Sequence, residues 1–209
     1  MDNKTEILSL NDPGVFRQAA AIIQAGGVIA FPTDTVYGIG ASAFNETAIE
    51  KIYQVKKRSH LKAIPILISD ANELSQIVTP INPITYKIVT NLWPGALTLI
   101  LPIHPNLPGN LSEKDTIGVR VPDHDLVREL LRVTGPIAAT SANLSGKPSA
   151  LTAEDVIHQL GGSIDLILNG GPAPGGMAST VLDCSGEEPA IFREGPVSWE
   201  QIALIFKQS

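Results

Sequence analysis

Cysteine is nearly absent from the sequence: Cys184 is the only one in 209 residues. A single cysteine excludes a disulfide within the chain and any zinc site built from cysteines. It lies in the apolar run STVLDCS, which is more typical of a small buried side chain than of a reactive thiol. A reducing, cytoplasmic location is therefore expected.

Long hydrophobic runs and an excess of basic charge are also missing. No apolar run approaches the roughly 18 residues that a membrane-spanning helix needs, and the polar start MDNKTEILSL does not resemble a secretory signal. With 21 acidic and 15 basic residues the net charge is -6. This charge argues against a broad nucleic-acid surface, although it leaves room for a local basic pocket.

What the sequence does contain is an alternation of short β-rich runs and amphipathic segments. Helices are predicted over residues 11–27, 45–58, 82–93, 123–135 and 151–162 and at the C-terminus, with Asp12, Asn45, Thr152 and the pair Ser198 and Gln201 as N-terminal caps. Between them about seven strands are predicted. This order indicates an α/β protein with a largely parallel or mixed sheet, folded as one domain over residues 1–209.

Polar side chains follow several of the predicted strands directly. They are Thr33, Asp34 and Thr35; Arg120; Thr140, Ser141 and Asn143; Ser179 and Thr180; and Arg193. Each alone could be an ordinary turn or helix cap. Ligands of open α/β sheets bind beyond the strand ends, so five such groups in one chain predict that the strand ends converge on one pocket.

A cluster of cations lies where the second predicted helix ends. Lys56, Lys57, Arg58 and Lys62 fall within seven residues. Lys57 can be explained as a cation that stabilises the C-terminal end of this helix through the helix dipole. A cluster of this density also suits a polyphosphate, because lysine supplies a mobile charge and arginine a fork that matches phosphate oxygens.

The sequence matches several familiar catalytic and metal-binding motifs only in part. SGKPS resembles the end of a P-loop, but Ser141 stands where the first glycine belongs and Pro148 replaces the hydroxyl residue. Ser141 also lacks a G-x-S-x-G elbow. The histidines show no metal-ligand spacing, and Asp34 alone does not make an acidic metal cluster. Covalent acyl-enzyme chemistry and a protein-held metal are therefore not predicted.

Six segments together resemble the YrdC-type threonylcarbamoyl-adenylate synthases: FPTDTVYGIGASAF, KKRSHLKAIPILIS, LWPGALTLIL, TIGVRVPDH, TSANLSGKPS and STVLDCSG…IFREG. The resemblance covers nearly the whole chain in the right order, and matches the short, single-domain form. It implies a twisted mixed sheet with a large concave site. It also implies that L-threonine, bicarbonate (or carbon dioxide) and ATP with Mg²⁺ give threonylcarbamoyl-AMP and pyrophosphate for the threonylcarbamoyladenosine modification of tRNA.

The resemblance assigns roles to individual residues. Threonine is expected to contact Thr33, Arg120 and Ser179, and ATP to contact Lys56, Arg58, Thr116, Ser141, Asn143 and Arg193. Lys56, Arg58, Ser141 and Asn143 are the expected catalytic set, and no residue is assigned to a metal. Ser59 and Ala63 depart from the proline of many members, and Leu67 from the histidine of archaeal ones.

The implied chemistry asks little covalent work of the protein. A carbamate formed from the threonine amine attacks the α-phosphate, and positioned cations neutralise the charge. Because the carbamate is labile in water, the loop Asn169–Gly176 is a candidate lid; a static turn explains this loop equally well.

Two alternatives belong to the same fold. One is an RNA-binding or ribosome-maturation protein, which would need a broad basic face. The other is a YciO-like paralogue, a group that lacks the K-x-R pair and the S-x-N turn seen here as Lys56, Arg58, Ser141 and Asn143. The synthase interpretation implies a downstream tRNA threonylcarbamoyl transferase complex as partner, at most weak tRNA binding, and no membrane.

Overall fold

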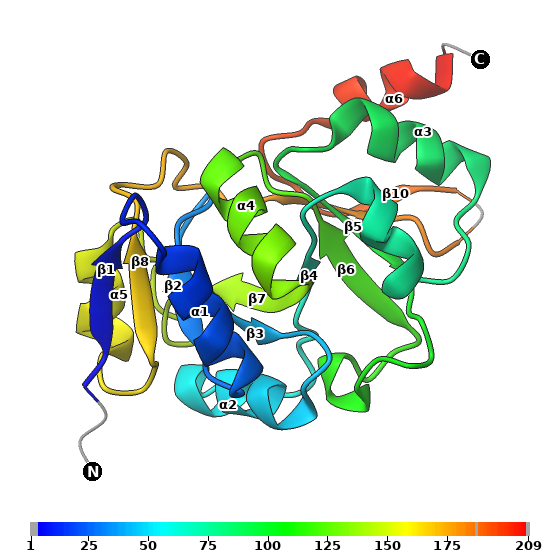
Figure 1. The fold of residues 1–209 in the computed structure, drawn as a ribbon. Coiled ribbons are helices and arrows are strands. Elements are labelled where there is room, and N and C mark those ends of the chain that lie inside the picture. The colour runs from blue at the N-terminus through cyan, green and yellow to red at the C-terminus, as the bar shows by residue number, and fades with distance from the viewer. Residues whose placement is uncertain (1–3, 187, 208–209) are drawn as a thin grey trace.

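The computed structural model describes residues 4–186 and 188–207. Its described strands form one ten-stranded mixed sheet in the order β1-β8-β2-β3-β7-β4-β6-β5-β9-β10 (Figure 1). The strands are β1 (Glu6–Ser9), β2 (Ile29–Phe31), β3 (Gly38–Ser42), β4 (Ile66–Leu67), β5 (Leu97–Pro102), β6 (Thr116–Arg120), β7 (Ile137–Ser141), β8 (Leu166–Asn169), β9 (Thr180–Asp183) and β10 (Ala190–Arg193).

The described helices are α1 (Val15–Gln24), α2 (Glu46–Lys56), α3 (Pro83–Leu92), α4 (Asp125–Thr134), α5 (Ala153–Leu160) and α6 (Trp199–Lys207), with two 3₁₀ turns, η1 (Ala71–Gln76) and η2 (Gly109–Leu111). The predicted helix-flanked mixed sheet is confirmed. None of the helices within the described residues is both long enough and apolar enough to span a membrane.

The prediction of about seven strands is wrong, because the sheet has ten. Two short strands, β1 and β3, were not predicted. Strand β3 reads GIGAS, and its glycines look like a turn in the sequence. In the structure a Cβ on Gly40 would lie 2.3 Å from Ile137 Cγ2, so glycine is required there by close packing against β7.

The helix starts were predicted with mixed success. The side chains of Asn45 and Thr152 accept hydrogen bonds from the first turns of α2 and α5, as expected. Helix α1, however, begins at Val15 after Gly14, which has a φ of 84°. Asp12 instead accepts a bond from the Ser9 amide in the preceding turn, so it does not cap the helix.

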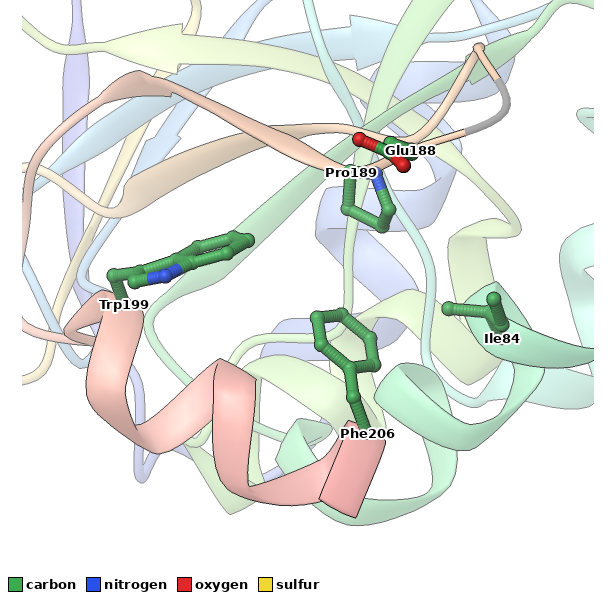
Figure 2. A pocket seen from close by; sticks show the side chains of 5 residues that line it. All are labelled: Ile84, Glu188, Pro189, Trp199 and Phe206. Carbon is green, nitrogen blue, oxygen red and sulfur yellow. The ribbon is translucent and has the colours of Figure 1, made fainter. Parts of the chain in front are cut away.

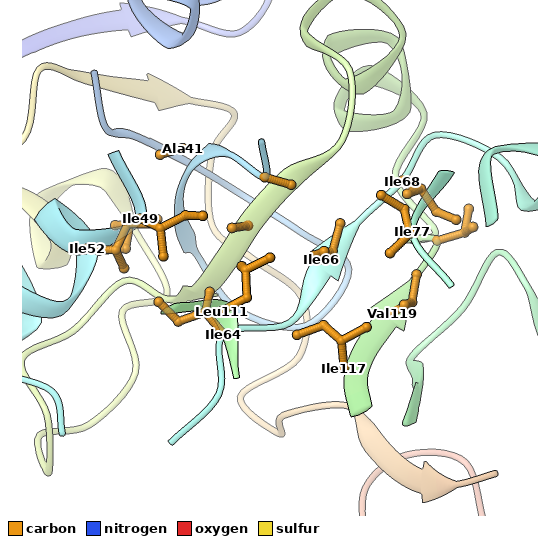
Figure 3. Close-up of a cluster of buried hydrophobic side chains, with 14 of the residues drawn as sticks. Ala41, Ile49, Ile52, Ile64, Ile66, Ile68, Ile77, Leu111, Ile117 and Val119 are labelled. Atoms are coloured by element: carbon orange, nitrogen blue, oxygen red, sulfur yellow. The ribbon is translucent and has the colours of Figure 1, made fainter. Parts of the chain in front are cut away.

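The sheet buries two hydrophobic clusters on its two faces. The larger cluster contains side chains from α2, α3 and α5 and from the sheet. Figure 3 shows part of it, with the sheet residues Ile66, Ile117 and Val119. The smaller one joins α1 and α4 to strands β2, β4, β7 and β8. It includes no described residue of β5, β6 or β9, so this part of the second face is not packed under the two helices.

Candidate functional site

Strand β6 forms the floor of the candidate site. Ile117 and Val119 point into the larger core, and since side chains alternate along a strand, Thr116, Gly118 and Arg120 face the opposite side. A Cβ at Gly118 would lie 3.1 Å from Thr98 Cγ2 and 3.2 Å from Pro65 Cβ. No side chain therefore projects from Gly118 between Thr116 and Arg120, which lie about 13 Å apart along the strand.

We expected the strand ends to converge on one pocket, and the strand register shows that they do not all lie at the same end of the sheet. Arg120 and Ile137 are both register partners of Leu67, and Ser141 lies at the other end of β7. Because β6 runs parallel and β7 antiparallel to β4, which lies between them, Arg120 and Ser141 lie at opposite ends of the sheet. Arg120, Thr116 and Ser141 nevertheless share a face of the sheet, with Arg120 near one end and Ser141 and Thr116 near the other.

At one end Arg120 is buried and bound to Asp34. Its Nη2 donates to both carboxylate oxygens of Asp34 at 2.6 Å, Nη1 to Thr35 Oγ1 at 3.1 Å and Nε to Gly95 O at 2.8 Å. Arginine has five N–H donors, so one N–H of Nη1 is left for a ligand in this arrangement. Burial lowers the pKa of Arg120, and Asp34 opposes this shift.

The predicted residue Thr33 lies in the same turn as these partners. Its hydroxyl donates to Val36 O at 2.7 Å and lies 2.9 Å from Thr35 Oγ1, and it is 5% exposed. The hydroxyl therefore helps to shape the turn that holds Asp34 and Thr35 against Arg120.

Ser179 and Arg193 extend this end of the site toward the edge of the sheet. Ser179 Oγ lies 2.8 Å from Thr98 Oγ1, and the Arg193 guanidinium donates to Ser179 O through Nη2 at 2.7 Å. The charge of Arg193 is a minor cause of the lowered pKa of Arg120, after burial. Arg193, expected among the ATP contacts, thus lies beside residues expected to bind threonine.

At the other end Lys56 is buried among oxygens. Its Nζ donates to Ser141 O, to Asn143 O at 2.6 Å and to Asn143 Oδ1 at 3.5 Å, and its exposed fraction is 1%. Burial, and after it the charge of Arg58, lowers the pKa of Lys56 to about 7. We expected a cluster of cations at this helix end, and the structure buries Lys56 there in the interior.

Arg58 is half-buried at the start of the loop that leads into β4. Its Nε donates to Lys62 O at 3.0 Å and its Nη2 to Ala63 O at 2.8 Å, and burial lowers its pKa. Lys57 adopts the left-handed conformation with a φ of 50°, which ends α2 and redirects the chain toward Arg58. Extension of the β4–β6 register brings Ala63 level with Thr116.

The loop Asn169–Gly176 is tied to the turn around Thr33. Tyr37 Oη donates to Gly171 O at 2.6 Å, and the Gly176 amide donates to Thr35 O at 3.2 Å. A Cβ on Gly175 would lie 2.5 Å from Thr35 O. Thr35 therefore contacts both this loop and Arg120.

A separate apolar hollow lies between α3, β10 and α6. It encloses about 290 Å³ and is lined by Ile84, Glu188, Pro189, Trp199 and Phe206 (Figure 2). None of the predicted site residues lines it. Its apolar walls do not suit a triphosphate or a zwitterion.

Sequence reasoning missed part of the site. Asp34 was included among the polar side chains at the strand ends and was weighed as a metal ligand, but its pairing with Arg120 across 86 positions was not predicted, because it has no local signal. Thr98 was also missed. Thr116 was found through the resemblance, although the pattern T-x-G-x-R on one strand places it on the same face as Arg120. Among the residues that the structure describes, no three His, Cys, Asp or Glu side chains are grouped to hold a metal ion.

Comparison with known proteins places this geometry in a family. A family model described as "Telomere recombination", that of the Sua5/YciO/YrdC proteins, matches residues 21–195. The threonylcarbamoyl-AMP synthase of Bacillus subtilis is 44% identical over 204 residues, which make up 96% of this chain and 59% of that protein. The chain thus spans about three fifths of this relative.

Solved structures of members of this family are also similar to this chain. Pyrococcus abyssi Sua5 complexed with L-threonine superimposes with a TM-score of 0.90 at 34% identity, covering 97% of this chain and 60% of the other. Escherichia coli YciO gives a TM-score of 0.85 at 28% identity, covering 96% and 99%. The chain belongs to the Sua5/YciO/YrdC family.

Proposed function

We propose that the protein is an L-threonylcarbamoyladenylate synthase. It would convert L-threonine, bicarbonate or carbon dioxide, and ATP into threonylcarbamoyl-AMP and pyrophosphate for tRNA modification. Family membership and the name of the Bacillus subtilis relative support this activity. The observation that carries the proposal is that Arg120, paired with a carboxylate, lies at one end of β6, while Lys56, two residues before Arg58, binds Ser141 and Asn143 at the opposite end of the sheet.

The Arg120 end is the proposed threonine site. The remaining N–H of Arg120 can bind a carboxylate, and the neighbouring hydroxyls of Ser179 and Thr98 can bind the polar groups of a small amino acid. Asp34 keeps the local charge low, because it neutralises Arg120. A site of this kind suits a zwitterion better than a polyanion. The threonine-bound Sua5 structure supports the same class of ligand.

The other end is the proposed nucleotide site. It comprises Lys56, Arg58, Thr116, Ser141 and Asn143, and no described carboxylate pairs with either cation. Such uncompensated charge favours a triphosphate. We place Arg193 where the two substrates meet, since it lies beside Ser179 and its guanidinium can bind an α-phosphate oxygen.

The chemistry then follows from this placement. The neutral threonine amine bonds to carbon dioxide and releases a proton to solvent, which gives a carbamate. A carbamate oxygen then bonds to the α-phosphorus as the bond from this phosphorus to the bridging oxygen of the β-phosphate breaks and pyrophosphate leaves. The protein aligns the two anions and neutralises the developing charge. Magnesium would arrive bound to ATP and supply further neutralisation. A cytoplasmic location and a downstream transferase that consumes the product are parts of the same proposal.

The test is threonine-dependent release of pyrophosphate by the pure protein with ATP, magnesium and bicarbonate. We expect release that requires both threonine and bicarbonate, and less release when serine replaces threonine. The product should have the mass of threonylcarbamoyl-AMP. Equal release without threonine would contradict the proposal.

The two rival functions predict other outcomes. An RNA-binding role predicts tight, steeply salt-dependent retention of tRNA on filters, which the net charge of -6 disfavours. A YciO-like role is disfavoured by the lower identity and TM-score of the YciO structure relative to Sua5. Neither rival predicts threonine-dependent pyrophosphate release.

A further inference from the structure

The cationic end of the site contains four residues whose hydrogen-bonding capacity is used very differently. Lys56 has three ammonium hydrogens, and its Nζ has three oxygen partners: Ser141 O, Asn143 O and Asn143 Oδ1. With 1% of its surface exposed, it offers neither a free donor nor an open surface. A phosphate could bind Lys56 only if one of these bonds broke.

Asn143 is committed in the same way. Its Nδ2 donates to Leu144 O at 2.8 Å and to Lys147 O at 2.7 Å, which uses both amide hydrogens. Its Oδ1 accepts from Lys56, and the residue is 6% exposed. The hydrogen-bonding groups of the Asn143 side chain are therefore used within the turn and by Lys56.

The same turn is hydrogen-bonded to two helices, α2 and α5. The Ser145 amide donates to Lys56 O at the end of α2. From α5, Gln159 accepts from the Leu144 amide at 3.2 Å and donates to Pro148 O at 3.1 Å. Residues 141–148, which we call the S-x-N turn, are thus fixed on both sides before any ligand is present.

Arg58 and Ser141 differ from this pair. Two of the five N–H donors of Arg58 bind loop carbonyls, and the other three have no recorded partner among the described residues. The Ser141 hydroxyl likewise has no recorded partner in the described part of the chain, and Ser141 is partly exposed. These two side chains keep the capacity to bind a ligand.

We propose that Lys56 and Asn143 are positioning residues that clamp the S-x-N turn to the end of α2, and that Arg58 and Ser141 are the members of the four that contact the nucleotide. This assignment rests on the proposed function of the site. It revises the expectation that all four residues touch ATP. Lys56 would act on the nucleotide only through the position of Ser141.

The clamp can be tested first without any nucleotide. In Lys56→Met the Ser141 and Asn143 oxygens lose their common donor, so amide hydrogen exchange within residues 141–148 should become roughly 10- to 100-fold faster, as for the loss of a charge-assisted bond. Arg58→Ala should leave exchange there unchanged. Unchanged exchange in Lys56→Met would overturn the clamp.

Nucleotide binding then separates positioning from contact. Titration with a non-hydrolysable ATP analogue should give roughly 10- to 100-fold weaker binding for Lys56→Met and for Asn143→Ala. Because both act through one turn, the double variant should be no weaker than the weaker single variant. Lys56→Met combined with Arg58→Ala should instead show the product of the two losses. Multiplying effects in the Lys56–Asn143 pair would overturn the proposal.

Gln159→Met provides a second route if Lys56→Met does not fold. It removes the two bonds from α5 to the S-x-N turn and leaves Lys56, Arg58 and Ser141 in place. We expect faster exchange in the turn together with weaker nucleotide binding. Faster exchange with unchanged binding would overturn the link between the turn and the nucleotide. If the wild-type protein itself does not bind the nucleotide, the proposed function fails, whereas the exchange result still decides the clamp.

Discussion

The two ends of the candidate site compensate their buried charge in different ways. Arg120 faces the carboxylate of Asp34 at 2.6 Å, whereas Lys56 has neutral carbonyl and amide oxygens as partners. A carboxylate cancels a charge, and dipoles solvate it without cancelling it. One end therefore carries little net charge, whereas at the other no described carboxylate offsets the charge of Arg58 or of protonated Lys56. This difference is the physical basis for placing a zwitterion at the first and a triphosphate at the second.

The largest effect is expected from Arg58→Ala. The variant loses the free guanidinium donors at the uncompensated end, so kcat/KM for ATP should fall by about 100-fold or more, which is about 3 kcal/mol of transition-state stabilisation. Only two loop carbonyls lose a donor, so the free energy of unfolding should fall by about 1 kcal/mol. Steady-state kinetics and thermal unfolding measure the two quantities.

Lys57→Ala is the matched control for Arg58→Ala. Lys57 is the neighbouring cation and is exposed, so its removal should leave the KM for ATP within about twofold of the wild type. An equal loss in both variants would mean that general positive charge, and not the Arg58 fork, binds the nucleotide.

A smaller effect, on threonine binding instead of ATP binding, is expected from Arg120→Ala. The KM for threonine should rise about 10- to 100-fold with little change for ATP. Asp34 would be left buried without its partner, so the free energy of unfolding should fall by about 3 kcal/mol. In the double variant with Asp34→Ala most of this stability should return, but threonine binding should not. Equal losses for ATP and threonine would contradict the division of the site into two ends.

These two ends were predicted from the sequence to different degrees. The residue types and the family were accessible, because six motifs lie in order along the chain. The local caps at Asn45 and Thr152 were accessible too, since a cap is decided within one turn. The partners of Lys56 and Arg120 were not, because they lie 85 to 87 positions away in the sequence. Only the strand order brings them together.

The sheet itself shows the same limit. Strand β3 was hidden because Gly40 must be small for contact with Ile137, and a strand with glycines has no side-chain alternation to detect. The antiparallel direction of β7 relative to β4 also has no local signal. The sequence therefore did not predict that Arg120 and Ser141 lie at opposite ends of their strands, although both were predicted as site residues.

The pH dependence of the free energy of unfolding tests how the charge of Lys56 is compensated. The pKa of Lys56 is about 7 in the folded protein and lies near its ordinary 10.5 in the unfolded chain. Between these values the unfolded state binds more protons, so this lysine should add to stability as pH rises, by up to about 1.4 kcal/mol per pH unit. Below pH 7 that contribution is absent. Denaturant unfolding of the wild type and Lys56→Met should therefore diverge between pH 7 and 10.5; parallel curves would contradict the low pKa.

The smallest effect is expected from Lys57→Gly. Lys57 has a φ of 50° at the end of α2, a conformation that glycine adopts without a steric penalty. The relief of strain in the folded state is partly offset by the greater conformational entropy that glycine gives the unfolded chain, so the variant should be more stable by at most about 1 kcal/mol. Kinetics for ATP should stay at the wild-type level. A loss of stability would mean that the Lys57 side chain itself stabilises the helix end.

The division of the site is tested most directly by nitrogen-15 spectra that resolve the Nε–H signals of the arginines in the wild-type protein. Threonine alone should shift the Arg120 signal and leave that of Arg58 in place. A non-hydrolysable ATP analogue alone should shift Arg58 and leave Arg120 in place. If either ligand shifts both signals equally, or if the pattern is reversed, the assignment of the two ends is wrong.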